Sequence, residues 1–112
     1  DSWTHYQENC DALNLEWVAF GHIGNNHIHV NILPRSIEEL NQGLELYQLF
    51  AQKAVEWGGA VSAEHGIGKI KQNFLALMFT PEQISQMQHV KAVFDPDYLL
   101  NPGDLFPCEV CA

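Results

Sequence analysis

The sequence has few basic residues and lacks any long apolar run. Five lysines and arginines stand against fourteen aspartates and glutamates, which gives a formal net charge of -9. A surface this acidic repels phosphate backbones and anionic lipids, which argues against nucleic acid as a partner. No run reaches the roughly 18 apolar residues of a membrane span, and the first residues lack the pattern of a secretory signal. We therefore expect a cytoplasmic protein without a transmembrane segment, attached to a membrane, if at all, through partners of a parent protein.

Cysteine is also scarce: the sequence contains only Cys10, Cys108 and Cys111. Cys108 and Cys111 form a C-x-x-C pair in the last few residues, where a chain is usually poorly ordered. Two free thiols in a frayed tail are favoured over half of a metal or redox site. The first residue is not Met, so we expect a fragment of a longer protein. The length and the 46% hydrophobic composition suit one core, and we expect residues 1–112 to form a single partial domain.

Two apolar stretches predict the strands of a hairpin. Residues 14–22, NLEWVAFGH, are rich in apolar and aromatic types and run into the glycines of a tight connection. Residues 27–33, HIHVNIL, alternate apolar side chains with two histidines and an asparagine. Asn25 and Asn26 suit the turn between them, because asparagine tolerates the left-handed conformation. One face of the hairpin should therefore pack, and the other should present polar chemistry.

Capping signals predict two helices after the hairpin. The S-x-x-E sequence that starts at Ser36 begins a helix over 36–57, and a T-P-x-Q sequence begins another over 80–94. Between them, residues 59–66 predict a third strand, and residues 69–79 have helical composition. Strands and helices mixed with a hairpin predict an α+β fold, an antiparallel sheet with helices packed on one face.

Three histidines and one Glu-His pair are candidate metal-binding residues. Antiparallel pairing should bring His22 back across the turn toward His29 on the polar face, and imidazole suits zinc, iron and similar metals. Glu64 and His65 are the candidates for a third ligand, provided that the strand has ended where two glycines follow them. By itself, the hairpin fits a solvated polar face better than a metal site. Its combination with the Glu-His pair favours a metal site.

Three segments resemble those of a known family. GHIGNNHIHVN at 21–31, SAEHGIG at 62–68 and VKAVFDPDYLLNPG at 90–103 are similar, in the same order, to segments of the FAD-linked oxidase C-terminal domain. This family includes the glycolate oxidase flavin subunit, D-lactate dehydrogenases and D-2-hydroxyglutarate dehydrogenase. The resemblance implies a C-terminal fragment of a flavin-dependent dehydrogenase, part of a ferredoxin-like substrate domain. The domain that binds FAD would belong to the missing part of the parent chain.

The resemblance also implies roles for single residues. Three positions match ligands of a divalent metal, with zinc favoured: His22, His29 and Glu64. The position of Asn31 contacts the substrate, and that of Asn101 lies near the flavin. His65 matches the base that takes the proton of the substrate hydroxyl while hydride leaves the adjacent carbon for FAD. A metal would lower the pKa of that hydroxyl and fix its geometry.

The first segment departs from the family pattern at Asn25, Asn26 and His27, where many members have Asp-Gly-Asn. His27 could be a fourth metal ligand, a hydrogen-bond donor beside the ligands, or a surface residue, and the surface interpretation is favoured. Because the flavin domain and the front half of the substrate domain are missing, we expect the fragment alone to be inactive. Its exposed strand edge should favour self-association. The alternative function is a stand-alone module that binds a divalent metal or a partner and has no flavin.

Overall fold

The computed structural model describes residues 1–62 and 64–107, with Ile23 described by its backbone alone. Cys108 and Cys111, the C-x-x-C pair, lie outside the described residues. The chain forms two compact units, residues 1–57 and the part from Gly58 onward. In the described residues, four α-helices and a two-stranded antiparallel sheet confirm the α+β prediction. The ferredoxin-like domain and the single partial domain stay predictions.

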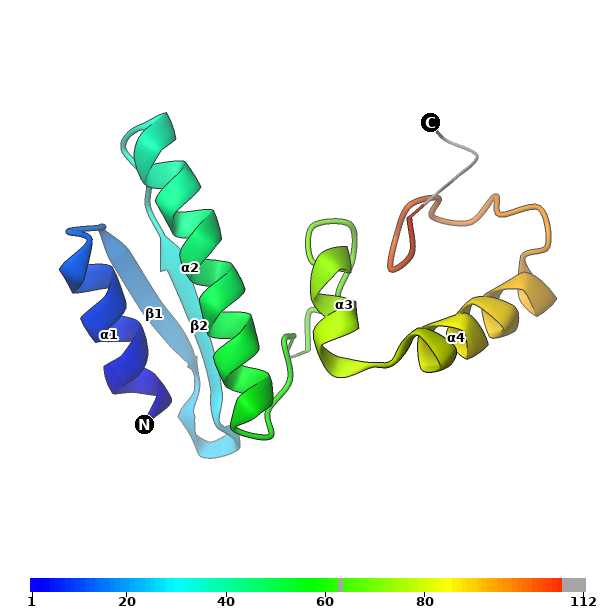
Figure 1. Cartoon of the computed structure of the whole chain (residues 1–112), viewed down its shortest axis with the longest axis horizontal. Coiled ribbons are helices and arrows are strands. Elements are labelled where there is room, and N and C mark those ends of the chain that lie inside the picture. The colour runs from blue at the N-terminus through cyan, green and yellow to red at the C-terminus, as the bar shows by residue number, and fades with distance from the viewer. Residues whose placement is uncertain (63, 108–112) are drawn as a thin grey trace. The chain divides into compact units, whose positions relative to one another are not determined.

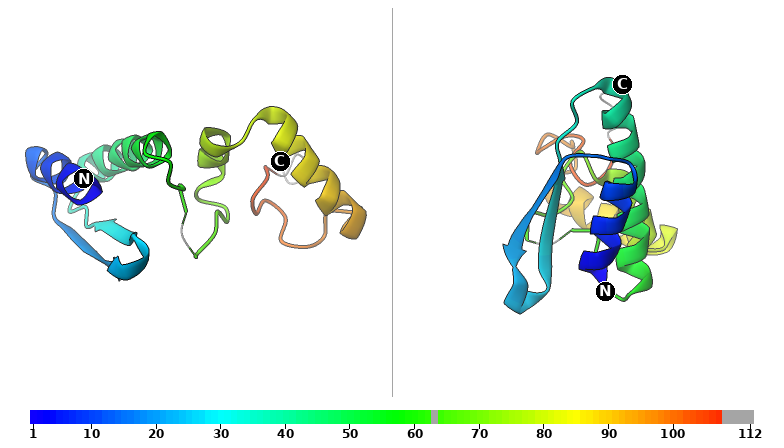
Figure 2. Two further views of the ribbon diagram at one scale, coloured as in Figure 1. Left: turned by 90° about the horizontal axis from the view of Figure 1, so that it is seen from below. Right: turned by 90° about the vertical axis from the view of Figure 1, so that its left-hand side faces the viewer.

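The first unit is a β-hairpin with two helices on one of its faces (Figures 1 and 2). Its elements in chain order are α1 (Ser2–Ala12), β1 (Trp17–His22), the 3-10 turn η1 (Ile23–Asn25), β2 (His27–Ile32) and α2 (Ile37–Glu56). The strands are antiparallel, with Trp17 opposite Ile32 and His22 opposite His27. The predicted hairpin and the helix that follows it are therefore confirmed.

Alternation along β2 decides which face of the hairpin packs. Val30 and Ile32 contact a core of four buried residues, which are Cys10, Leu15, Leu46 and Phe50. Tyr47 of α2 attaches the helix to the strand, because its hydroxyl donates a hydrogen bond to the Val30 carbonyl at 3.0 Å. Gly43 of α2 is buried at a point where a Cβ would lie only 3.3 Å from Ile32 Cγ2. The helices thus cover the apolar face closely, and the polar face stays open.

The sequence does not predict α1, whose residues SWTHYQENCDA form no continuous apolar stripe. Asp1 caps its first turn by accepting a hydrogen bond from the Thr4 N–H at 2.9 Å. Cys10 is fully buried in the core, and the rings of Tyr6 and Phe50 lie with their centroids 4.6 Å apart. Packing against α2 and the hairpin therefore stabilises this helix more than its intrinsic propensity does.

The start of α2 has the predicted cap, and Glu39 of that cap also makes a second connection. Ser36 Oγ accepts a hydrogen bond from the Glu39 N–H at 3.1 Å. The Glu39 carboxylate accepts from the Arg35 backbone N–H at 2.8 Å and from its guanidinium at 2.9 Å. These bonds hold the pKa of the Glu39 carboxyl below its usual range. The same guanidinium donates to the Asn14 carbonyl at 3.0 Å, so Arg35 joins the segment before β1 to the start of α2.

The second unit contains α3 (Gln72–Met78), α4 (Pro81–Phe94) and the loops around them. The helical composition of 69–79 therefore predicted α3 correctly. The strand predicted over 59–66 is wrong, because the described residues 59–62 and 64–66 form turns and irregular structure. A strand needs a neighbour for its backbone N–H and C=O groups, and the described part of this unit provides none.

No helix among the described residues is both long and apolar enough to cross a lipid bilayer.

The boundaries of α4 are set by side chains at each end. At its start, Thr80 Oγ1 accepts from the Gln83 N–H at 3.3 Å and Gln83 Oε1 accepts from the Thr80 N–H at 2.9 Å, which completes the predicted capping box. At its end, the buried carboxylate of Asp95 accepts from the N–H groups of Leu99 at 2.9 Å and Leu100 at 3.1 Å. Asp95 therefore bends the chain after α4 into a tight loop.

We predict that acid loosens this loop through Asp95. Lys91 Nζ donates to the carboxylate at 2.6 Å, and this bond, with the two from the loop backbone, holds the Asp95 pKa below its usual range. A carboxyl with a lower pKa in the folded state stabilises the fold above its unfolded-state pKa of about 3.9, and the stabilisation is lost as the pH falls through the folded-state pKa. Amide hydrogen exchange of Leu99 and Leu100, corrected for intrinsic rates, should show protection falling in acid.

Asp95→Asn should have weaker protection at neutral pH and a smaller further loss in acid. Asp97 in the same loop is exposed, so Asp97→Asn is the matched control and should behave as the wild type does. Full protection of Leu99 and Leu100 in Asp95→Asn at neutral pH would contradict this account of the loop.

Candidate functional site

The open face of the hairpin carries the histidines that the sequence singles out. Side chains on this face form three opposite pairs: His22 with His27, Phe20 with His29, and Val18 with Asn31. His22 and Asn31 are exposed, and His27 and His29 are partly buried. His22 therefore does return across the turn to the face of His29, one pair further along the sheet.

A close backbone contact at Gly21 sets the register of these pairs. A Cβ at Gly21 would overlap the His27 carbonyl oxygen and lie 3.3 Å from Ile28 Cα. The residue has φ of 148°, which residues with side chains rarely adopt. In the turn, Asn26 takes the left-handed conformation with φ of 54°, as its residue type predicts. Position 21 therefore requires a residue without a side chain, because β1 can then approach β2 closely.

His29 is held against an exposed aromatic ring. The His29 and Phe20 rings stack with centroids 5.3 Å apart and planes at 23°. Phe20 nevertheless remains 58% exposed, and its neighbour on the same face, Val18, is 45% exposed. The open face thus combines imidazoles with an apolar portion, which suits contact with an organic molecule better than a purely polar surface would.

The Glu-His pair of the second unit lies in a tight turn. His65 Nε2 and Glu64 Oε1 are 3.3 Å apart, and the side chains are 70% and 46% exposed. The Ser62 hydroxyl donates a hydrogen bond to the Gly66 carbonyl across this turn. Gly66 and Gly68 have φ of 74° and 57°, so the backbone bends as the sequence indicates. The turn allows adjacent side chains to approach each other, whereas a regular strand would direct them to opposite faces.

The closing segment is attached to the same unit by backbone contacts. The Leu105 N–H donates to the Gly68 carbonyl at 3.0 Å. Gln72, the first residue of α3, donates from Nε2 to the carbonyls of Gly103 and Phe106, the latter at 3.3 Å. The Glu-His turn and the Asn-Pro-Gly segment, far apart in sequence, are therefore joined beside the start of α3. Asn101 is exposed in this segment and has φ of 44°.

Sequence reasoning missed Gln72 and Ser62, the side chains that hold these loops. Neither has a sequence signal, because an amide at the start of a helix and a serine before a turn are common in any protein. Gly21 had a signal, since a glycine within a strand indicates close backbone approach.

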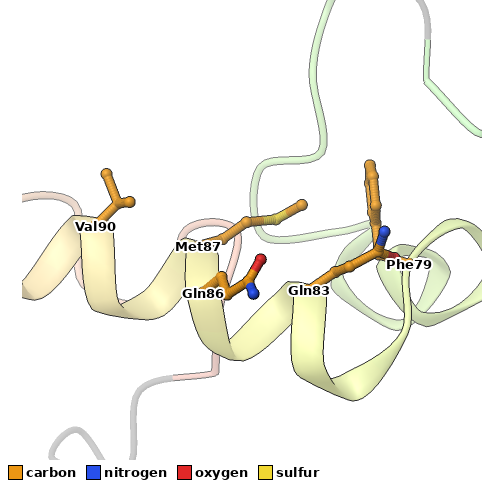
Figure 3. Close-up of a pocket in the computed structure, with 5 residues that line it drawn as sticks. All are labelled: Phe79, Gln83, Gln86, Met87 and Val90. Atoms are coloured by element: carbon orange, nitrogen blue, oxygen red, sulfur yellow. The ribbon is translucent and has the colours of Figure 1, made fainter.

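A shallow hollow lies along α4. Phe79, Gln83, Gln86, Met87 and Val90 line it (Figure 3). None of these side chains titrates near neutral pH, so the hollow offers no acid, base or strong metal ligand. Elsewhere in this unit, Glu64 and His65 place a carboxylate next to an imidazole.

We predict that Gly21→Ala disrupts the hairpin whereas Gly24→Ala does not. The methyl group at position 21 would overlap a backbone carbonyl, so one strand must shift, while a Cβ at Gly24 meets nothing within 4 Å. An incompatible backbone conformation typically costs roughly 1 to 3 kcal/mol. Thermal unfolding of the two variants measures the difference, and amide chemical shifts of β1 and β2 show whether the register changes. Equal stability of the two variants would contradict the role given to Gly21.

Residues 1–105 match the family model described as FAD linked oxidases, C-terminal domain. A D-2-hydroxyglutarate dehydrogenase from Stutzerimonas stutzeri is 36% identical over 97 residues, 83% of this chain and 21% of that protein. Glycolate oxidase subunit GlcD of Bacillus subtilis is 35% identical over 90 residues, 79% of this chain and 19% of the relative. A D-lactate dehydrogenase from Anaerostipes hadrus is 39% identical over 90 residues, 78% and 19% of the two chains. The chain spans about a fifth of the length of these relatives. Because the family model matches nearly all of the chain, the chain belongs to the FAD-linked oxidase C-terminal domain family.

Proposed function

We propose that the chain is the C-terminal, substrate- and metal-binding part of a flavin-dependent dehydrogenase that oxidises a D-2-hydroxy acid to the 2-oxo acid. The observation that carries this proposal is the Glu64–His65 pair in its glycine-bounded turn, in a chain of the FAD-linked oxidase family. The similar proteins named as D-2-hydroxyglutarate dehydrogenase, D-lactate dehydrogenase and glycolate oxidase support this substrate class.

His65 is the proposed catalytic base. Its imidazole is 70% exposed, so a substrate can reach it, and Glu64 lies 3.3 Å from its Nε2. A carboxylate at one ring nitrogen fixes the tautomer and orientation of the ring. The unperturbed pKa of histidine lies near neutrality, which suits removal of the hydroxyl proton at physiological pH. The hydroxyl proton would go to His65, and the hydride of the adjacent carbon would go to the FAD of the parent protein, which would be reduced.

The proposed metal ligands are His22, His29 and Glu64. Two imidazoles on one face of the hairpin and one exposed carboxylate are chemically suited to a divalent ion of the zinc type. Such an ion would supply Lewis-acid polarisation of the substrate hydroxyl and carboxylate. The Phe20 stack orients the His29 ring, and Gly21 keeps His22 on the same face.

Two asparagines have proposed binding roles. Asn31 is exposed on the face of His29, where its amide can bind a polar group of the substrate. Asn101 lies in the closing segment and is assigned to the flavin side. FAD held by the parent protein would supply the hydride acceptor. Since this chain spans about a fifth of its relatives, the flavin domain is assigned to the remainder of the parent, and the chain alone is proposed to be inactive.

The roles of His65 and Glu64 are separable in the full-length parent. His65→Asn should leave flavin bound but slow its reduction by substrate about 10²- to 10⁴-fold, the usual cost of losing a general base. Glu64→Gln should lower metal content and substrate affinity together, and excess metal should partly restore activity. Single-turnover mixing with a panel of D-2-hydroxy acids measures the reduction rate, and metal analysis gives occupancy. His89→Asn, which changes an exposed histidine of α4, is the matched control.

Reduction of the His65→Asn flavin at the wild-type rate would contradict the base assignment. A parent protein that binds no flavin would instead support the second candidate, a stand-alone metal-binding or interaction module. Its supporting observation is the hairpin with its histidines, which is complete within residues 1–57.

We also propose that the isolated chain self-associates. Within the described residues, β1 and β2 pair only with each other, and the hairpin exposes Phe20 and Val18 beside these strand edges. Light scattering after size exclusion should show a dimer or larger species, and Val18→Lys should shift it toward monomer because a lysine on an edge strand hinders pairing. A wild-type monomer at all concentrations would contradict this proposal.

A further inference from the structure

His27 has a position that the family resemblance does not explain. The register places it directly opposite His22, with the two residues closing the hairpin beside the turn. Residues directly opposite in an antiparallel pair have Cβ atoms about 4.5 to 5.5 Å apart and point to the same face. Two imidazoles at that separation can bind one ion between them, because each ring extends several ångströms from its Cβ.

Backbone constraints hold this histidine pair in place. Gly21 precedes His22 and lies against the carbonyl of His27 itself, so the strands cannot slip here without a steric cost. Asn26 precedes His27 in the left-handed conformation of the turn. Both histidines are thus attached to positions with restricted backbone freedom. A preorganised pair loses less conformational entropy on binding an ion than two histidines on a flexible loop would.

His29 is a less suitable partner for His27. Residues two apart on one strand are separated by about 7 Å along it, and the ring of His29 is stacked on Phe20. The register places His27 opposite His22, whereas His29 lies opposite Phe20, and the His22 side chain is exposed on the open face. Of the two neighbours of His27 on this face, the cross-strand one therefore has the better geometry.

We propose that His22 and His27 together bind a divalent transition-metal ion on the hairpin, without any ligand from the second unit. The ion belongs to the class that prefers imidazole, such as Zn²⁺, Ni²⁺ or Cu²⁺, and water completes its coordination. The excess of acidic residues, with a net charge of -9, favours cation approach. The site shares His22 with the proposed substrate metal site, yet it requires neither Glu64 nor flavin. This proposal can therefore be tested independently of the proposed function.

Calorimetric titration of the 112-residue chain with Ni²⁺, at a mildly alkaline pH that keeps imidazole neutral, tests this pair. One ion should bind, and His22→Asn and His27→Asn should each weaken binding by at least about tenfold, since even partners outside the ligand shell cost about 10- to 100-fold. The control His89→Asn should bind Ni²⁺ as the wild type does. Cu²⁺ should bind more tightly than Ni²⁺, and Ni²⁺ more tightly than Co²⁺.

Thermal unfolding with and without metal shows whether a variant binds less metal because it no longer folds. Ni²⁺ should raise the melting temperature of the wild type, because an ion bound only by the folded hairpin stabilises it. Without metal, His27→Asn should have the melting temperature of the wild type, and added Ni²⁺ should not raise it. Wild-type affinity in His27→Asn, or no binding by the wild type, would overturn the proposal. Loss of Ni²⁺ binding in Glu64→Gln, with no loss in His27→Asn, would also overturn the proposal. That result would support the proposed substrate metal site.

Discussion

The approach of β1 to β2 at Gly21 is the constraint on which the first unit depends. With a glycine at that point the strands pair so that Val30 and Ile32 face the helices and the histidines face away. A shift of one residue would turn every side chain of a strand to the other face. The same contact therefore protects the apolar core and assembles the imidazoles on the open face.

The second unit depends on polar attachments more than on a large core. Leu75 and Phe106 are buried, as is the carboxylate of Asp95, and the loops are held by hydrogen bonds from Gln72 and Leu105. These bonds join the Glu-His turn to the closing Asn-Pro-Gly segment. Several large apolar side chains remain exposed in this unit: Ile70, Val90, Val93, Phe94, Leu99 and Leu100. Exposed apolar area of this extent is typical of surfaces that contact other protein.

The two units contribute different chemistry to the proposed reaction. The hairpin provides imidazoles and an aromatic ring, which suit the proposed metal and an organic substrate. The turn provides a carboxylate next to an imidazole, which suits proton transfer. Each arrangement uses positive backbone φ angles, which favour glycine or asparagine, at Gly21 and Asn26 in one unit and at Gly66 in the other.

Local signals in the sequence determined the hairpin, the capped helices α2 and α4, and the residue types of the candidate site, because periodicity and caps act over a few residues. They also indicated that His22 and His29 share a face. Tertiary structure alone decided α1, whose Cys10 and Tyr6 are stabilised by packing against distant residues. It also decided that residues 59–66 form no strand in their described part, since a strand requires a partner that local sequence does not specify. The cross-strand pairing of His22 with His27 was likewise settled by register, which depends on how closely two backbones can approach.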